Sequence, residues 1–355
     1  MIYVLLFAIM VFVKIIVFTI FIVSPQKLFS GGNDGDYYDA YARGADLVTS
    51  SIWPDVLRSL NSIGLYSREG VSFFMMLLGV IAIPLLVGRL ALVRGAAADR
   101  KVCLLLVLGV SCYPTLFYYT MDIYRDVLML FVFLVGLALV RSSLESPHQI
   151  NRWLSALAIL ILSYVMFLLR GYLGFAFAVS FITFRFVRFS KLPLLVYVLP
   201  ILVALNVLFA LGYLQPLMKY RELFNALQGG SDLGIRFESI YTFIPEFIHS
   251  FSGQMLGLFY PNLTAILIFL VESLPFFVAL VYLVRNRRFS NRFVDFIFVF
   301  FIVYSIIWLL GNDNLGTAAR LRMYNYLGVL IAFAIVYQRK KYAECVWAQD
   351  RVLSG

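Results

Sequence analysis

Long runs of apolar residues alternate with short polar stretches along almost the whole chain. Each run has about 20 residues, the length at which an α-helix crosses a hydrocarbon core of about 30 Å. The alternation typical of an outer-membrane barrel is absent, so we predict helices, in which every backbone group bonds within its own segment. The pattern predicts about ten spans, at residues 1–24, 71–93, 102–120, 125–141, 153–169, 171–187, 192–214, 259–284, 293–310 and 323–338.

Basic residues distinguish the two sides of this arrangement. With the N-terminus in the cytoplasm, every predicted cytoplasmic connection is rich in Lys and Arg, as the positive-inside rule requires. The sequence therefore predicts that both termini lie in the cytoplasm and that two larger loops, about 25–70 and 215–258, lie outside. The basic residues concerned are Arg94, Arg100, Lys101, Arg141, Arg152, Arg185, Arg188, Lys191, Arg285, Arg287, Arg288, Arg292, Arg339, Lys340, Lys341 and Arg351.

The composition agrees with a membrane protein and excludes several classes of function. Hydrophobic residues make up 62% of the chain and charged residues 14%, with a mean hydropathy of +0.91, whereas soluble domains are about 25% charged. The net charge of +10 collects on the predicted cytoplasmic side, so we predict no nucleic-acid partner. The three cysteines and two histidines lack ligand spacing, so we predict neither a metal site nor a cofactor.

No repeat or soluble domain interrupts the pattern, so residues 1–355 are predicted to form a single membrane domain, an all-α polytopic bundle. We interpret the first segment as a retained anchor, because Lys14 interrupts it and no small-x-small cleavage site precedes Pro25. Amphipathic stretches at about 216–227 and 237–250 predict two short helices on the membrane surface. They would form a mobile lid or an ordinary solvated loop.

An acidic segment follows the first span directly. It contains Asp34, Asp36 and Asp39, with Tyr37 between them. Asp36, Asp39 and Arg43 would share one face of a short helix. Clustered carboxylates can supply a general base, so the three aspartates are candidate catalytic residues and Tyr37 is a candidate substrate contact. The structural alternative is an Asp/Gly-rich turn with an acidic helix start.

Charged residues also stand at the outer ends of the middle spans. Arg125 and Asp126 follow a connection too short to hold a domain, and Arg170, close to Tyr172, separates two spans with almost no loop. Charges at this depth are costly to desolvate and often functional. The structural alternatives are a capping salt bridge for the first pair and snorkelling for Arg170.

Further arginines lie on the same predicted side. Arg320 and Arg322 precede the last span beside Tyr324, and Arg236 lies in the second large loop. Guanidinium groups bind phosphate oxygens in a bidentate manner, so arginines from separate helix ends indicate an anionic ligand, for which a diphosphate is a natural candidate. An acidic residue would then act on an incoming hydroxyl while arginines stabilise the leaving phosphate. This hypothesis requires the carboxylates and the arginines to meet at one cavity.

In these features the chain resembles the bacterial surface-polysaccharide polymerases of the O-antigen polymerase (Wzy-type) family and its exopolysaccharide relatives. The resemblance covers most of the chain in architecture and is carried by short motifs. These are the Asp-Gly-Asp-Tyr-Tyr segment that begins at Asp34, Arg125-Asp126, the Arg-Gly-Tyr at Arg170, and the arginine pair before the last span.

The resemblance implies a glycosyl transfer on the periplasmic face of the bacterial inner membrane, without a nucleotide-sugar donor. The enzyme would move a growing glycan from undecaprenyl diphosphate onto the next lipid-linked repeat unit. Its partners would be the lipid-linked glycan, membrane lipids and, as a candidate, a chain-length regulator protein. The related O-antigen ligases carry Arg-x-x-x-Leu, which neither Arg221 nor Arg236 matches, so a ligase is disfavoured.

Two alternatives stay open. The lipid-phosphate-sugar glycosyltransferases of the type C fold carry an acidic pair after the first helix that is similar to two of Asp34, Asp36 and Asp39, but they usually have a larger soluble domain. A transporter of lipid-linked glycans or small polar substrates is the rival from another class. It is weakly supported, because the intramembrane charges do not form a polar stripe through several spans.

Overall fold

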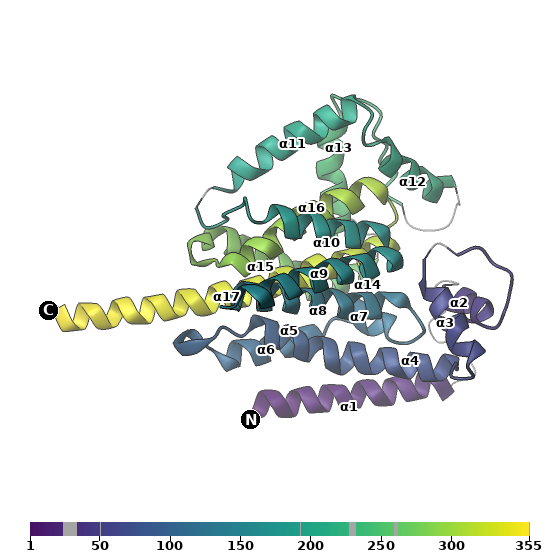
Figure 1. The fold of residues 1–355 in the computed structure, drawn as a ribbon, viewed down its shortest axis with the longest axis horizontal. Coiled ribbons are helices and arrows are strands. Elements are labelled where there is room, and N and C mark those ends of the chain that lie inside the picture. The colour runs from purple at the N-terminus through teal and green to yellow at the C-terminus, as the bar shows by residue number, and fades with distance from the viewer. Residues whose placement is uncertain (24–33, 50, 192, 227–231, 259–261, 355) are drawn as a thin grey trace. The chain divides into compact units, whose positions relative to one another are not determined.

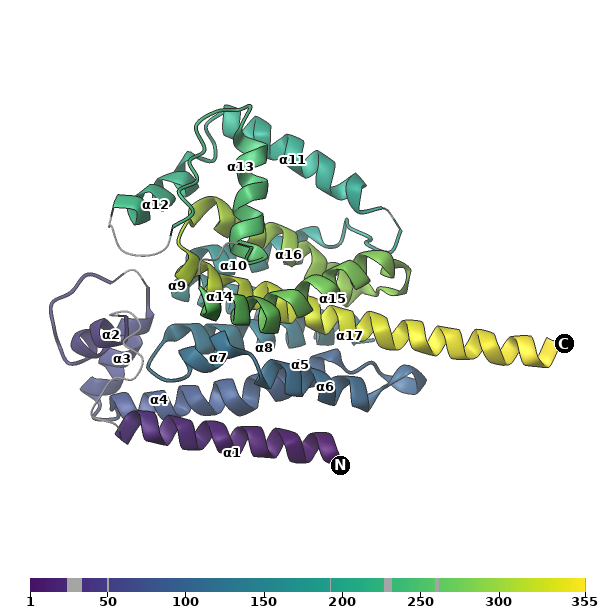
Figure 2. The same ribbon diagram turned by 180° about the vertical axis from the view of Figure 1, so that it is seen from behind.

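The computed structural model describes residues 1–23, 34–49, 51–191, 193–226, 232–258 and 262–354. In these ranges all regular structure is helical, apart from one isolated antiparallel bridge between Asp232 and Asn314. The all-α class expected from the sequence is therefore confirmed. The chain forms two compact units, which are described separately (Figures 1 and 2): unit 1 is Met1–Leu92 with Arg100–Phe175, and unit 2 is Val93–Asp99 with Ala176–Gly355.

Unit 1 combines long helices with several short ones. Its helices are α1 (Ile2–Val23), α2 (Asp34–Ala42), α3 (Trp53–Ser62), α4 (Arg68–Leu77), the π-helical turn η1 (Leu78–Ala82), α5 (Ile83–Ala91), α6 (Arg100–Ser111), α7 (Pro114–Tyr119), α8 (Arg125–Glu145) and α9 (Gln149–Leu169). Helix α10 (Gly171–Thr183) begins in this unit and ends in the other.

Unit 2 contains the rest of the chain. Its elements are η2 (Gly95–Ala97), α11 (Leu194–Ala210), α12 (Gln215–Ala226), α13 (Phe243–Ser250), η3 (Phe251–Met255), α14 (Leu263–Ile268), η4 (Phe269–Ser273), α15 (Leu274–Arg285), η5 (Arg287–Phe289), α16 (Arg292–Gly311) and α17 (Leu315–Ser354). Helices α12 and α13 fall at the two predicted amphipathic stretches. The predicted loop residues 25–33 and 227–231 lie outside the described residues.

Seven helical segments within the described part of the chain are long and apolar enough to cross a membrane. They are Ile2–Val23, Arg68–Ala91, Arg125–Glu145, Gln149–Leu169, Leu263–Arg285, Arg292–Gly311 and Leu315–Val346. Each coincides with one of the ten predicted spans. The other three predicted spans, 102–120, 171–187 and 192–214, correspond to shorter helices.

The predicted span at 102–120 is wrong as a single helix, for a local reason. Helix α6 ends at Ser111, Tyr113 is extended, and Pro114 opens α7. Proline has no N–H to continue the ladder and disfavours helical geometry in the residue before it. The 12 residues of α6 extend about 18 Å, which is well short of a hydrocarbon core of about 30 Å. Helices α10 and α11, with 13 and 17 residues, are also shorter than the seven.

Helix packing in unit 1 is built around α8. Helix α8 lies against α5 and α9, α5 lies against α6, and α1 lies along α6. Only Phe18 of α1 is buried, in a cluster with Met76, Val80 and Met121. The remaining apolar surface of α1 suits contact with lipid. Lys14 is the exception, and it donates to the Ser111 carbonyl oxygen.

Unit 2 is organised around α17, which packs against both α15 and α16. Most residues of α16 are buried. Aromatic rings fill the interior: Phe276 stacks on Tyr326 at 4.1 Å and Phe300 on Tyr304 at 5.1 Å between ring centroids. The first stack joins α15 to α17, and the second lies within α16, whose Tyr304 meets Tyr324 of α17 edge-to-face at 5.6 Å. Each large ring thus has a defined neighbour, which fixes α15 and α16 against α17.

The π-helical turn η4 lies within the span that runs from α14 to α15. A π-turn holds one more residue than an α-helical turn and often marks a functional position. Here Glu272 and Ser273 are buried, whereas Leu270 and Val271 just before them are exposed. The turn thus directs the Glu272 carboxylate into the interior of unit 2, whereas the side chains just before it face outward.

Candidate functional site

The acidic segment folds as α2, which packs on α3 beside the start of α4, as Figures 1 and 2 both show. Asp34 and Asp36 occupy the first turn of α2, where the unpaired N–H groups of a helix favour negative charge. The Tyr41 hydroxyl donates to Asp55 of α3 at 2.6 Å. The Tyr37 hydroxyl donates to the Val48 carbonyl oxygen at 2.6 Å, so its contact is with the backbone of the loop.

Asp39 binds two other residues of the first large loop. It pairs with Arg43 at 3.0 Å, as the i,i+4 spacing predicts, and it accepts a hydrogen bond from the Tyr66 hydroxyl at 2.7 Å. Burial and this hydrogen bond raise the pKa of the Tyr66 phenol well above its usual value. Tyr66 is therefore a neutral donor that fixes Asp39, and the geometry favours a positioning role for this carboxylate.

Arg68 joins α2 to the connection between α7 and α8. Its Nη1 lies 2.7 Å from Asp36 Oδ1, while Nε lies 2.9 Å from Asp122 Oδ1 and Nη2 contacts the second oxygen of Asp122. The pairing with Asp122 is bidentate, the geometry in which guanidinium and carboxylate bind most specifically. Arg68 is the first residue of α4, and the Ser67 side chain caps that helix. One guanidinium therefore fixes two carboxylates that are distant in sequence.

Gly35 allows this close approach. A Cβ atom at Gly35 would overlap the carboxylate of Asp122 and come within 3.1 Å of Arg68 Nη2. The missing side chain thus lets the backbone of α2 lie directly on the Arg68–Asp122 pair. Nearby, the Trp53 indole donates to the Ile123 carbonyl oxygen at 2.9 Å and ties α3 to the same connection.

A second pair lies at the start of α8. Asp126 and Arg170 form an ion pair at 3.3 Å, with both side chains almost fully buried. Arg125 Nη1 donates to the Leu169 carbonyl oxygen at 3.1 Å, and the Arg170 guanidinium lies over the Tyr172 ring at 5.6 Å. Arg170 is extended between α9 and α10. The charged residues at the start of α8 and just before α10, both candidates from the sequence, therefore meet in unit 1.

Tyr38 relates this pair to the acidic helix. Burial raises the pKa of its phenol; the charges of Arg125 and Arg170 oppose this shift, whereas those of Asp34 and Asp126 add to it. The four charged groups thus act on a single hydroxyl. Because the pKa is raised, Tyr38 is protonated at neutral pH and can donate a hydrogen bond to an anion or a sugar oxygen.

The other sequence candidates belong to unit 2. Arg322 pairs with the buried Glu272 at 3.3 Å and lies over the Tyr326 ring at 5.4 Å. It also lines a cavity of about 330 Å³ together with Gln254, Asn262, Thr264 and Ser273.

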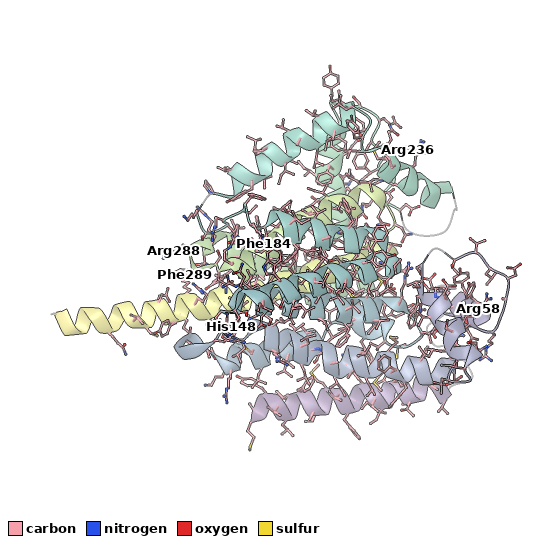
Figure 3. The ribbon with its side chains drawn as sticks, viewed as in Figure 1. Arg58, His148, Phe184, Arg236, Arg288 and Phe289 are labelled. Carbon is pink, nitrogen blue, oxygen red and sulfur yellow. The ribbon has the colours of Figure 1, made fainter. Side chains whose placement is uncertain are left out.

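Arg320, Tyr324 and Arg236 differ in exposure. Arg320 is half-buried on α17. Tyr324 is fully buried, with its ring edge-to-face with Tyr304 at 5.6 Å. Arg236 is exposed on an irregular segment before α13 (Figure 3). Tyr324 thus belongs to the aromatic core of unit 2, and Arg236 is open to solvent.

Arg221 forms a buried cluster that fastens the second large loop. Its guanidinium donates to the Ile235 carbonyl oxygen at 3.0 Å, to that of Asn312 at 2.9 Å, and to the Asp313 carboxylate. Asp313 also accepts from the Gly234 amide at 2.9 Å. Burial raises the pKa of the Asp313 carboxyl, and the charge of Arg221 opposes this shift. The cluster positions the loop on the connection between α16 and α17.

Sequence reasoning missed Arg68, and a signal for it was present. Arg68 is a basic residue at the outer end of a predicted span, against the positive-inside bias, directly after an acidic loop. A residue that departs from the charge rule needs a partner, and here it has two. Asp122 was not among the predicted site residues, and Arg221 had no predicted role beyond its mismatch to the ligase motif.

Comparison of the chain with family models, with curated proteins and with solved structures gave no match.

Proposed function

We propose that the protein is a membrane glycosyltransferase that polymerises oligosaccharide repeat units carried on undecaprenyl diphosphate, acting on the periplasmic face of the inner membrane. The observation that carries the proposal is the pairing, within unit 1, of Asp36 with Arg68 and of Asp126 with Arg170, with Arg125 bound to the backbone next to Arg170. Carboxylates and guanidinium groups are the groups that such a transfer needs.

Asp36 is the candidate general base. Its side chain is 50% exposed, so a sugar hydroxyl can reach it, and Arg68 fixes its orientation. Asp39 lies deeper, at 20% exposure, between Arg43 and Tyr66. We therefore assign base catalysis to Asp36, with Asp34 as the second candidate.

The transfer would proceed by substitution at the anomeric carbon. The acceptor hydroxyl gives its proton to the Asp36 carboxylate and its oxygen forms the new glycosidic bond. The bond between the donor sugar and its diphosphate breaks, and undecaprenyl diphosphate leaves with the bonding electrons. Arg125 and Arg170 would stabilise the negative charge that develops on the departing diphosphate, since fixed cations act most strongly where water is excluded.

The distribution of charge supports the periplasmic assignment. Arg68, Arg125 and Arg170 stand at the helix ends opposite to those that carry the basic connections. By the positive-inside rule these ends face away from the cytoplasm. Lipid-linked repeat units that have been carried across the membrane would be accessible there.

Reconstitution tests the proposal directly. Purified protein in proteoliposomes is given lipid-linked oligosaccharide extracted from the bacterium that makes the protein. Gel electrophoresis then measures the length of the lipid-linked glycan. We expect a ladder of longer glycans, its loss in Asp36→Asn, and an unchanged ladder in Asp46→Asn, an exposed aspartate of the same loop. Movement of the oligosaccharide across the bilayer without lengthening would show a transporter instead.

A further inference from the structure

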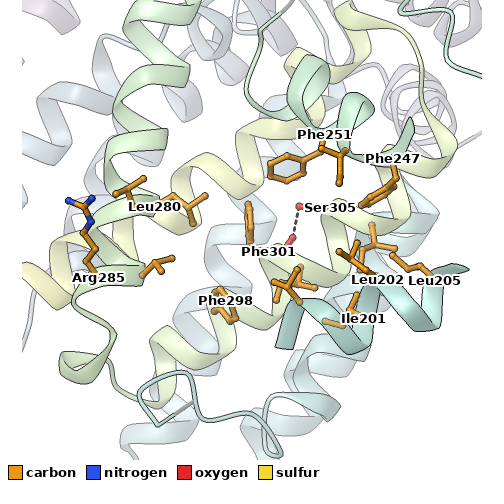
Figure 4. Close-up of a pocket in the computed structure, with 16 residues that line it drawn as sticks. Ile201, Leu202, Leu205, Phe247, Phe251, Leu280, Arg285, Phe298, Phe301 and Ser305 are labelled. Carbon is orange, nitrogen blue, oxygen red and sulfur yellow. Dashed lines mark hydrogen bonds between the residues drawn. The ribbon is translucent and has the colours of Figure 1, made fainter. Parts of the chain in front are cut away.

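Unit 2 contains an apolar groove of about 590 Å³ beside the long helices α15 and α16 (Figure 4). Its walls come from α11, α13, η3, α15 and α16. A volume of this size falls in the range of sites that hold a small molecule, roughly 300–1,000 Å³. We call it the α11 groove, and its walls include Leu202, Leu205, Phe247, Leu280, Phe298 and Phe301.

Aromatic contacts hold α11 at both ends of this groove. Near the start of the helix the Tyr197 ring meets Phe298 at 6.4 Å, and near its end Phe209 stacks on Phe243 at 4.6 Å. Between these contacts the side chains of α11 line the groove across from those of α15 and α16. An additional chain of atoms would complete the packing of α11.

The walls dictate an apolar occupant. Ser305 is the one wall residue with an uncharged polar side chain, and its hydroxyl donates to the Phe301 carbonyl oxygen at 2.5 Å and accepts from Asn325 at 2.9 Å. No other wall residue offers a hydrogen bond along the length of the groove, apart from Arg285 at one end. Apolar cavities of this kind do not hold ordered water. Since α15 and α16 are membrane spans by length and composition, a hydrocarbon chain is the available occupant.

The charged end specifies the head group. Arg285 ends α15 and is exposed, and among the described residues it makes neither an ion pair nor a hydrogen bond. Arg287 and Arg288 follow in η5, and the buried Nε of Arg287 also lacks a hydrogen-bond partner within the described ranges. Arg292 differs, because it is bound to Asp295 and to the Val187 carbonyl oxygen. Unneutralised arginines beside an apolar groove complement an anionic phosphate.

We propose that the α11 groove binds one acyl chain of an anionic glycerophospholipid whose phosphate contacts Arg285. The lipid fills the space between α11 and the α15–α16 pair and thereby stabilises the position of α11. This site is separate from the charged residues of unit 1 and does not depend on the proposed polymerase activity.

The test uses the purified full-length protein, stripped of lipid in detergent and incubated with phosphatidylglycerol or phosphatidylcholine of identical acyl chains. Native mass spectrometry measures the lipid retained. We expect phosphatidylglycerol to be retained about fivefold more strongly, the effect of one favourable arginine–phosphate contact. Arg285→Gln should reduce that retention to the level of phosphatidylcholine, whereas Arg339→Gln, on the exposed face of α17, should leave it unchanged.

A second variant examines the groove itself. Leu202→Trp places a large ring in the space for the acyl chain and should lower retention of both lipids, with gel filtration and circular dichroism reporting whether the fold is intact. If that variant does not fold, the Arg285→Gln result decides alone. Equal retention of the two lipids by the native protein, or no effect of Arg285→Gln, would overturn the proposal. So would displacement of the phospholipid by an equal concentration of a polyprenyl diphosphate, which would assign the groove to an isoprenoid carrier.

Discussion

Arg68 and Asp122 form a bidentate ion pair across 54 residues of sequence, and the same guanidinium reaches Asp36 at 2.7 Å. Three segments of unit 1, namely α2, the start of α4 and the α7–α8 connection, are therefore fixed by one side chain. The pair is partly buried, with 23% of the Arg68 side chain and 18% of the Asp122 side chain exposed. Arg68 thus joins these segments and also fixes the orientation of Asp36, the candidate base.

Arg68→Gln should both destabilise unit 1 and impair polymerisation. The substitution leaves two carboxylates without their shared cation, and we expect a loss of about 1–3 kcal/mol in the free energy of unfolding. Thermal unfolding in detergent measures the stability, and the proteoliposome assay measures the activity. Arg43→Gln, which removes an exposed guanidinium from the same loop, should change neither by much; an equal effect of both would mean that only the net charge of the loop matters.

Gly35→Ala should displace Asp122. The added methyl group would occupy the position of the Asp122 carboxylate, so the ion pair with Arg68 must shift, and we expect activity to fall at least tenfold. Gly109→Ala is the matched control, because a Cβ at Gly109 has no neighbour within 4 Å. It should leave activity unchanged and raise stability slightly, since alanine favours helix by about 1 kcal/mol over glycine. Full activity in Gly35→Ala would show that the pair is dispensable.

Replacing one partner of the buried Asp126–Arg170 pair should destabilise the protein more than replacing both. Arg170→Gln or Asp126→Asn alone leaves a buried charge without its counter-ion, and we expect a loss of about 3–5 kcal/mol in the free energy of unfolding. The double variant Arg170→Met, Asp126→Leu should recover most of the stability, because apolar side chains of similar volume tolerate burial. It should stay inactive if Arg170 binds the diphosphate. Restored activity in the double variant would make the pair purely structural.

Substitution of Asp36 should mainly lower activity, whereas substitution of Asp39 should mainly lower stability. Asp36→Asn keeps the size of the side chain and removes the proton acceptor, so polymerisation should fall by about two to four orders of magnitude with little change in stability. Asp39→Asn weakens the contacts with Arg43 and Tyr66 and should lower the thermal midpoint while retaining part of the activity. The reverse pattern would move the base from Asp36 to Asp39.

The native cysteines test the predicted orientation. Cys112 lies between α6 and α7 and Cys345 near the end of α17, and both are exposed, whereas Cys103 is buried. With the N-terminus in the cytoplasm, a membrane-impermeant maleimide should label Cys345 in inside-out vesicles and not in right-side-out vesicles, whereas Cys112, next to the carbonyl that Lys14 of α1 contacts, lies at the depth of the hydrocarbon core and should stay unlabelled in both. Single-cysteine variants and mass spectrometry identify the labelled site. Labelling of Cys345 in right-side-out vesicles would refute this orientation.

The sequence was sufficient for the class of fold and for part of the site. Apolar length predicted the seven long spans, because a hydrocarbon core demands a continuous helix of fixed length. The short helices were less predictable: α6 stops where Ser111, Tyr113 and Pro114 break the ladder, although the apolar run continues. Hydropathy does not register such a break.

Contacts between residues that are distant in sequence could not be predicted, and most of the site consists of such contacts. The spacing of Asp39 and Arg43 predicted their contact, because Arg43 follows the end of α2 directly and its amide still bonds to the Asp39 carbonyl oxygen, one turn back. The partners of Arg68 come from distant segments, so no local pattern contains them. The same holds for Arg221, whose ligands lie 14 to 92 residues away in sequence. A charged residue in an unexpected place predicts that a partner exists, but the fold decides which one.

The π-helical turn at Phe269–Ser273 makes the orientation of Glu272 depend on helix register. The turn already holds one residue more than an α-helical turn, so loss of a residue inside it would leave the two halves of the span in register. Removing a residue of the α-helical part, such as Val278 of α15, has no such compensation and would rotate Glu272 by about 100° relative to the C-terminal half of α15. Glu272 would then point toward lipid and Arg322 would lose its partner. A deletion of one apolar residue outside the turn should therefore harm this helix more than most single substitutions on its lipid-facing side.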